Sequence, residues 1–151
     1  MPRVVTLSKV FPAYMSNAGE STNFRELYER GIKKHTIRIK GKRPYVDGQI
    51  ISLRQWSGKP YCSPQEHIAD VRIRVIDFVM CRFGEGNSIG TNLHVLPRVI
   101  AESDGLDYPL FLEWFSKLPK YSPTAMQMLI WNQDGPYYLT DNYIDSFIHK
   151  P

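Results

Sequence analysis

A chain of 151 residues is long enough to bury the core of one domain. Hydrophobic residues make up 42% of it and aromatic residues 13%, which excludes an intrinsically disordered protein, and no apolar run approaches the ~18 residues of a membrane-spanning helix. The net charge is +4, Cys62 and Cys81 are the only cysteines, and the first residues lack the apolar segment of a secretory signal, so we expect a cytoplasmic protein.

The first part of the chain predicts a strand followed by a short helix. Residues 3–9 are rich in β-branched side chains, which favour a strand. The helix is expected at 24–30. Asn23 is a suitable N-cap, Glu26 can reach back to its amide, and Gly31 stands where many helices end in a left-handed residue.

Strands dominate the middle of the chain. Residues 35–40 alternate the apolar Ile37 and Ile39 with polar side chains, which is the period of a half-buried strand. Residues 46–56 predict another strand, which begins at an Asp-Gly turn. The glycine and the two prolines of 57–65 predict a loop after it.

A long β-rich segment at 67–83 changes the phase of its apolar residues after Val75. This change predicts a bulge or a sharp bend, which curved sheets and small barrels need. A hairpin loop at 84–87 and a returning strand at 88–96 are expected next.

Helices are expected at 96–105 and 107–118, and the last strand at 125–132. We expect residues 133–151 to form a C-terminal extension with a short helix at 140–148, and the alternatives for it are a docking helix, a closing element of the core or a dimer contact. The order of these elements predicts an α+β fold, with a curved, mostly antiparallel sheet and helices at one end.

Basic residues are concentrated in one window of the chain. Residues 30–59 carry nine basic side chains against one acid, a net charge of +8, whereas the rest of the chain carries −4. A local positive field of this kind favours a polyanionic partner such as nucleic acid. The alternative is a solvated basic edge that prevents pairing between strands of different molecules.

Cations and aromatic rings alternate around the loop at 57–65. Single-stranded nucleic acid suits such a surface, because unstacked bases lie on the rings while phosphates meet the cations. The alternative is that the rings only anchor the loop. The residues concerned are Arg54, Trp56, Lys59 and Tyr61.

Lys33, Thr36 and Arg38 place an amine, a hydroxyl and a guanidinium close together in the sequence. A lysine of lowered pKa could activate the threonine hydroxyl as a nucleophile, and an acid such as Asp104 or Glu102 could orient the lysine. The alternative is a phosphate seat that performs no chemistry.

The four histidines do not have the spacing of metal ligands, and the chain contains no CxxC motif. His35 shares its strand face with Ile37 and Ile39, which favours a hydrogen-bonded core histidine. We therefore expect no metal and no cofactor.

The pattern Gly31-x-Lys33-x-x-Thr36-x-Arg38 resembles the signature of the ASCH family, which belongs to the PUA-like superfamily. The segments KKHTIR, RQWSGKPY and IAESDGLDYPLFLEWF resemble successive segments of that family, and the likeness extends over residues 1–132. In the family signature an acid often stands at the position of Thr36. The resemblance implies one PUA-like domain, a small β-barrel flanked by helices, with a cleft that binds RNA or a modified nucleoside.

Some members that resemble the threonine variant are amidohydrolases that remove acyl groups from N4-acylated cytidines, while others cleave RNA or only bind it. In that pattern Lys33 matches the lysine and Thr36 the nucleophile. The family's acid is a glutamate before a helix; Asp104, which is shorter, matches its place best and Glu102 second.

We therefore expect a protein that binds RNA or a modified nucleoside. An amidohydrolase is the first alternative, and a barrel that binds another protein is the second. The candidate catalytic residues are Lys33, Thr36 and Asp104, with Glu102 as the alternative acid. The candidate nucleic-acid contacts are Lys34, Arg38, Arg54, Trp56, Lys59 and Tyr61.

Overall fold

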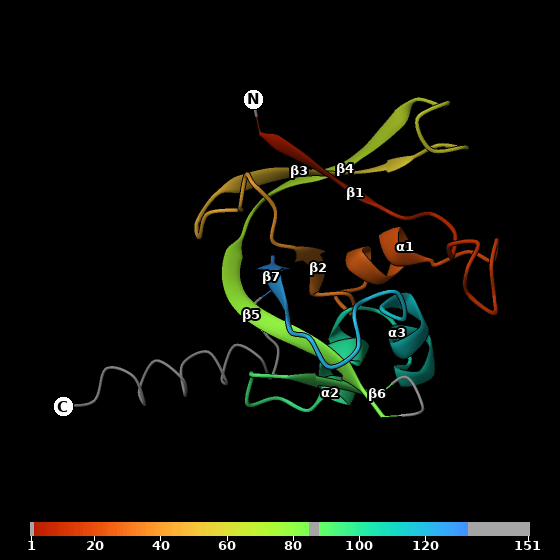
Figure 1. The fold of residues 1–151 in the computed structure, drawn as a ribbon. Coiled ribbons are helices and arrows are strands. Elements are labelled where there is room, and N and C mark those ends of the chain that lie inside the picture. The colour runs from red at the N-terminus through yellow and green to blue at the C-terminus, as the bar shows by residue number, and fades with distance from the viewer. Residues whose placement is uncertain (1, 85–87, 133–151) are drawn as a thin grey trace.

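A computed structural model describes residues 2–84 and 88–132 of the chain, which form an α+β fold with two sheets (Figure 1). The expected helix at 140–148 and most of the expected hairpin loop at 84–87 lie outside the described residues. In chain order the elements are β1 (Arg3–Leu7), α1 (Phe24–Glu29), β2 (His35–Ile39), β3 (Ile50–Trp56), β4 (Gln65–Arg72), β5 (Arg74–Phe83), β6 (Ser88–Thr91), α2 (Pro97–Ser103), α3 (Tyr108–Trp114) and β7 (Thr124–Ile130).

The two sheets are mostly antiparallel. The first has the strand order β1-β3-β4, in which β1 runs parallel to β3 and β3 antiparallel to β4. The second has the order β2-β7-β5-β6, and all of its pairs are antiparallel. Within residues 2–84 and 88–132, no strand pairing closes the two sheets into a barrel.

The bend expected in 67–83 is present, but it divides the segment into two strands that belong to different sheets. Ile73 lies between β4 and β5 and is buried. Its amide donates to the Gln49 carbonyl at 2.9 Å, and its carbonyl accepts from Gly48 at 2.8 Å. These two bonds hold the corner at which the curved ribbon of β4 and β5 passes from one sheet to the other (Figure 1).

The core lies between the two sheets and the helices. Ile51 and Leu53 of β3, Met128 of β7 and Phe111 of α3 are fully buried in it. Figure 1 shows α2 and α3 beside the β5–β6 end of the second sheet, with α1 close to β2. No helix in the described part of the chain has the length and apolar content to cross a membrane.

The expected cap of α1 is wrong in its details. Asn23 precedes the helix, but its backbone has φ 56 and its side chain makes no capping bond. Its Oδ1 accepts from the Ser21 hydroxyl instead, at 2.9 Å. Glu26 pairs with Arg30 at 3.9 Å, so it does not reach back to the helix start. The expected left-handed glycine is confirmed, because Gly31 has φ +73.

The expected alternation in β2 is correct for Ile37 and wrong for Ile39. Ile37 is buried, whereas Ile39 is 62% exposed. β2 is an edge strand of its sheet, so its last residue has a neighbouring strand on one side only. Ile39 accordingly lies at a cleft rather than in the core.

Gly105 is a sensitive position, because it combines a left-handed backbone with close packing. Its φ is +83, and an added Cβ would lie 3.2 Å from Leu27 Cδ1 and 3.4 Å from Lys33 Cβ. Gly19 also has φ +83, but no atom lies within 4 Å of the place of its Cβ.

We expect Gly105→Ala to lower the free energy of unfolding more than Gly19→Ala does. Both substitutions place a Cβ in the left-handed region, which costs about 1–2 kcal/mol. Only Gly105→Ala also crowds the core, which adds on the order of 1 kcal/mol. Urea unfolding of both variants measures the difference, and equal losses would contradict the packing described.

Candidate functional site

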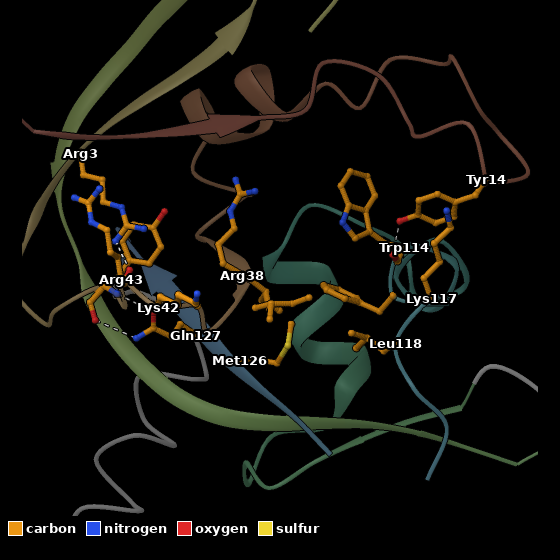
Figure 2. A pocket seen from close by; sticks show the side chains of 15 residues that line it. Arg3, Tyr14, Arg38, Lys42, Arg43, Trp114, Lys117, Leu118, Met126 and Gln127 are labelled. Carbon is orange, nitrogen blue, oxygen red and sulfur yellow. Dashed lines mark hydrogen bonds between the residues drawn. The ribbon is translucent and has the colours of Figure 1, made fainter. Parts of the chain in front are cut away.

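A cleft of about 590 Å³ opens between the β2 strand with the residues after it and the end of α3. Five of its lining residues are basic, and none is acidic. We call it the cationic cleft. Figure 2 shows the basic side chains on both sides of this space. They are Arg3, Arg38, Lys42, Arg43 and Lys117.

One wall of the cationic cleft is built around Tyr45. The guanidinium carbon of Arg3 lies 3.8 Å from the centre of the Tyr45 ring, and Arg3 Nη1 donates to the Arg43 carbonyl at 2.7 Å. The buried side-chain amide of Gln127 fixes the backbone of Tyr45 through two hydrogen bonds. Gln127 Oε1 accepts from the Tyr45 amide at 2.8 Å, and Nε2 donates to the Tyr45 carbonyl at 3.0 Å.

The opposite wall carries the indole of Trp114 and the phenol of Tyr14 (Figure 2). The Tyr14 hydroxyl donates to the Trp114 carbonyl at 2.6 Å, and Lys117 Nζ lies 4.4 Å from the centre of the Tyr14 ring. Between the walls the lining is partly apolar, with Ile37 from β2 and Met126 from β7. Each wall thus pairs an aromatic face with a cation.

A smaller inner cavity of about 40 Å³ adjoins the cationic cleft. Ile37, Arg38, Trp114 and Phe115 line both spaces. The inner cavity is also lined by three residues that the sequence singled out, and all three are buried. They are Lys33 at 2% exposure, Thr36 at 7% and Asp104 at 5%.

Lys33 and Asp104 form a buried ion pair in the inner cavity. Lys33 Nζ donates to Asp104 Oδ1 at 2.9 Å and to the Asp104 carbonyl at 2.7 Å. The same ammonium lies 4.0 Å from the centre of the Phe24 ring. His35 is fully buried, and its Nε2 lies 3.6 Å from Asp104 Oδ1. The expectation that His35 lies in the core is therefore confirmed, and its ring lies next to the carboxylate of Asp104.

Burial dominates the electrostatics of this group. It lowers the pKa of Lys33 and raises the pKa of Asp104, because both lose the solvation of their charged forms, and the attraction between the two charges opposes both shifts. Burial and the nearby Lys33 charge hold the pKa of His35 well below its usual range, so this imidazole is neutral at neutral pH. Burial also lowers the pKa of Arg38.

Glu102, the alternative acid, does not take part in this group. Its side chain is exposed on α2, whereas Asp104 is the residue that caps the end of that helix. Among the described residues, Lys33 pairs with Asp104 alone. The shorter aspartate reaches the lysine because the Lys34 amide donates to the Ser103 carbonyl at 2.7 Å, which brings the two backbones together.

The remaining predicted contacts lie apart from the cationic cleft. Arg54 lies on β3, where its Nε donates to the Ser52 hydroxyl at 3.1 Å. The rings of Trp56 and Tyr61 lie 5.1 Å apart at the β3–β4 hairpin, and Tyr61 is 88% exposed. Neither hollow space is lined by any of Lys34, Arg54, Trp56, Lys59 and Tyr61.

The sequence did not single out most of the cleft lining. Lys42 and Arg43 fall within the basic window, so that signal was present. Arg3 and Tyr14 lie near the start of the chain and Lys117 lies about a hundred residues later (Tyr14 to Trp114 spans 100 residues), and the three share no motif, so only the fold brings them together. No group of three or more His, Cys, Asp or Glu residues in 2–84 and 88–132 could hold a metal ion.

We expect Lys33→Met to lower the free energy of unfolding by about 3–5 kcal/mol at neutral pH, because it leaves the Asp104 carboxylate buried without its cation. Without the lysine, the pKa of Asp104 in the folded protein rises further above that of an unfolded aspartate. The folded state then binds more protons than the unfolded state, so the variant regains stability as the pH falls toward about 4.

Urea unfolding at several pH values measures this recovery. The double variant Lys33→Met/Asp104→Asn removes the buried carboxylate, so it is expected to lose the recovery at low pH. Lys59→Met, on the exposed hairpin loop, is the control and is expected to change stability by less than about 0.5 kcal/mol. A Lys33→Met variant as stable as Lys59→Met would contradict the buried pair.

Comparison of the chain with protein-family models, with curated proteins and with solved structures finds no match in any of the three. The cationic cleft, the inner cavity and the residues that line them are therefore the basis for inferring a function.

Proposed function

We propose that this protein binds RNA or a nucleoside-type ligand in the cationic cleft. The observation that carries the proposal is the lining of this cleft, in which five basic residues and no acidic residue lie beside the ring faces of Tyr14, Tyr45 and Trp114. Flat heterocycles stack on such faces, and phosphates meet the cations. The cleft volume of about 590 Å³ lies within the range of small-ligand sites.

A single-stranded segment or a free nucleoside fits this lining better than a duplex does. Unpaired bases expose their faces and edges, whereas paired bases are stacked inside the helix. The side chains of Trp114 and Tyr14 on one wall and of Tyr45 on the other offer rings to such a base. The basic side chains around them supply the salt-dependent part of binding.

Membership of the ASCH family and a PUA-like barrel are part of this proposal. Two features support them. The curved ribbon of β4 and β5 runs through both sheets, and the helices α2 and α3 lie at one end of the second sheet (Figure 1). The residues of the signature-like pattern, Lys33, Thr36 and Arg38, all line the inner cavity beside the cationic cleft.

An amidohydrolase is the second candidate, and the contact between Lys33 and Asp104 beside Thr36 favours it. In this mechanism the Thr36 hydroxyl attacks the acyl carbon of an N4-acylated cytidine and gives its proton to Lys33. The bond from the acyl carbon to N4 breaks, N4 leaves as an amine with that proton, and water then hydrolyses the threonine ester. Asp104 orients the lysine.

We rank binding above catalysis because the amine of Lys33 is buried and already hydrogen-bonded to Asp104. Its ammonium donates twice to Asp104 and faces the Phe24 ring, and it is only 2% exposed. A general base must reach the proton that it takes and must be unprotonated. The burial that lowers the pKa of Lys33 favours the neutral amine, while the pairing with Asp104 favours the cation.

We expect wild-type protein to bind a short single-stranded RNA with an affinity that falls as salt rises, with a slope of about −0.7 for each phosphate neutralised. Lys42→Ala/Arg43→Ala is expected to weaken binding by tenfold or more and to flatten the slope, because it removes two of the cations that line the cleft. Fluorescence anisotropy at several salt concentrations measures both quantities.

The matched control is Arg54→Ala/Lys59→Ala, which also removes two cations, but outside the cleft. It is expected to weaken binding much less. A larger loss in the control than in the cleft variant would assign binding to the β3–β4 hairpin instead. A flat salt profile, or no binding at low salt, would remove the RNA part of the proposal.

The amidohydrolase candidate predicts that the protein releases cytidine from N4-acetylcytidine. Thr36→Val has nearly the same shape but no hydroxyl, so it is expected to abolish release, whereas Thr36→Ser is expected to retain part of it. Chromatography of the products measures both. Turnover by Thr36→Val or Lys33→Ala at the wild-type rate would exclude the assigned roles. A protein that neither binds RNA and nucleosides nor releases cytidine would support the protein-interaction alternative.

A further inference from the structure

Arg38 lies at the centre of the cationic cleft. It projects from β2 between the Arg3, Lys42 and Arg43 side of the cleft and the Trp114 side (Figure 2). It also lines the inner cavity that holds Lys33 and Asp104. A ligand that extends from one wall to the other therefore passes over this guanidinium.

Most of the hydrogen-bonding capacity of Arg38 is unused. Within residues 2–84 and 88–132, its guanidinium makes one hydrogen bond, from Nη2 to the Thr6 carbonyl at 2.6 Å, and no ion pair with a carboxylate. Its Nε is buried and has no hydrogen-bond partner there. A guanidinium offers five N–H donors in a rigid fork that matches the oxygens of a phosphate or a carboxylate.

The charges around the inner cavity do not balance. Lys33 and Arg38 are cationic, Asp104 supplies one negative charge, and His35 is neutral. Asp104 is hydrogen-bonded to Lys33 at 2.9 Å and attracts Arg38 without contacting it, so no carboxylate in the described part of the chain contacts the Arg38 guanidinium. Burying a charge that no opposite charge contacts costs free energy, and an anion from outside the chain that binds Arg38 would offset this cost.

We propose that Arg38 holds an oxyanion of the ligand, so that the cationic cleft takes a phosphate-bearing nucleotide unit and discriminates against the bare nucleoside. The proposal rests on the proposed function and names the ligand class of the same cleft. Lys42, Arg43 and Arg3 reinforce the phosphate side, and the ring of Trp114 receives the base on the other side. The forked geometry of arginine suits two oxygens of one phosphate.

Calorimetric titration of the wild type separates this inference from the proposed function. The ligands are the four ribonucleosides, their 5′-monophosphates and inorganic phosphate. We expect at least one monophosphate to bind ten to a hundred times more tightly than its nucleoside, because a charge-assisted bond is added. Inorganic phosphate is expected to compete with that monophosphate.

Equal binding of nucleosides and monophosphates would overturn the role of Arg38 and would leave nucleoside binding in the cleft intact. RNA oligonucleotides could bind while no monophosphate does. If Arg38→Met also weakens that RNA binding, Arg38 holds a phosphate within a chain rather than a terminal one. Absence of binding by nucleosides, monophosphates and RNA would overturn the proposed function itself, and this inference with it.

The test variant is Arg38→Met, which retains most of the apolar stem and removes the guanidinium. It is expected to lose most of the preference for a monophosphate over its nucleoside, and only the weaker contribution of the other cations of the cleft remains. Arg38→Lys is expected to restore part of the preference, because a lysine carries the charge without the fork. Arg54→Met makes the same change on β3, outside the cleft, and is expected to keep the full preference.

A thermal measurement distinguishes anion binding from a merely structural role. Phosphate that binds only the folded protein raises its Tm, by mass action. The wild type and Arg54→Met are expected to show this rise, and Arg38→Met is expected to show a much smaller one. An Arg38→Met variant that unfolds at a lower Tm but shows the same rise with phosphate as the wild type would mean that Arg38 only supports the fold, through its bond to the Thr6 carbonyl.

Discussion

The buried pair of Lys33 and Asp104 is the interaction on which the site depends. It joins the start of β2 to the connection between α2 and α3, two segments that are 71 residues apart in the chain. Because Asp104 supplies both a carboxylate oxygen and its backbone carbonyl, the lysine is held at two points. A buried ion pair is weak evidence for stability, since desolvation offsets the attraction, but it constrains geometry strongly.

Two consequences follow from this constraint. The chain must turn immediately after Asp104, and Gly105 does so in a left-handed conformation that leaves room for the stem of Lys33. The position of α3 is then set, and with it the place of Trp114 across from Arg38. Two buried interactions thus hold the two walls of the cationic cleft in place. One is the ion pair behind α3, and the other is the Gln127 amide behind Tyr45.

The buried ion pair and the cations of the cleft have separate roles in this site. Among the described residues, Asp104 is the one carboxylate that lines the inner cavity, and its ion pair is with Lys33 rather than with a cation of the cleft. The cleft keeps its positive field, and the aromatic rings of Tyr14, Tyr45 and Trp114 line it. Basic residues gathered without acids cost stability in the free protein through mutual repulsion, and a bound anion removes that cost.

The sequence by itself determined the order of the elements and several of the site residues. The apolar periods and turn residues predicted the described strands and helices, except that β4 and β5 were expected as one continuous segment. The phase change near Val75 predicted the bend in it, although the corner lies at Ile73. These features are local, because period and turn chemistry depend on neighbours along the chain. The proximity of Lys33, Thr36 and Arg38 was visible for the same reason.

Only the tertiary structure decided which surfaces belong together. Lys59 and Lys42 fall in the same basic window, yet one lies on the β3–β4 hairpin and the other lines the cleft. Arg3 and Lys117 share no motif, yet both line it. The resemblance had ranked Asp104 before Glu102, but only the structure shows that Asp104 contacts Lys33 while the side chain of Glu102 is exposed. Strand pairing and helix packing set distances between residues far apart in the chain, and no pattern of neighbouring residues encodes those distances.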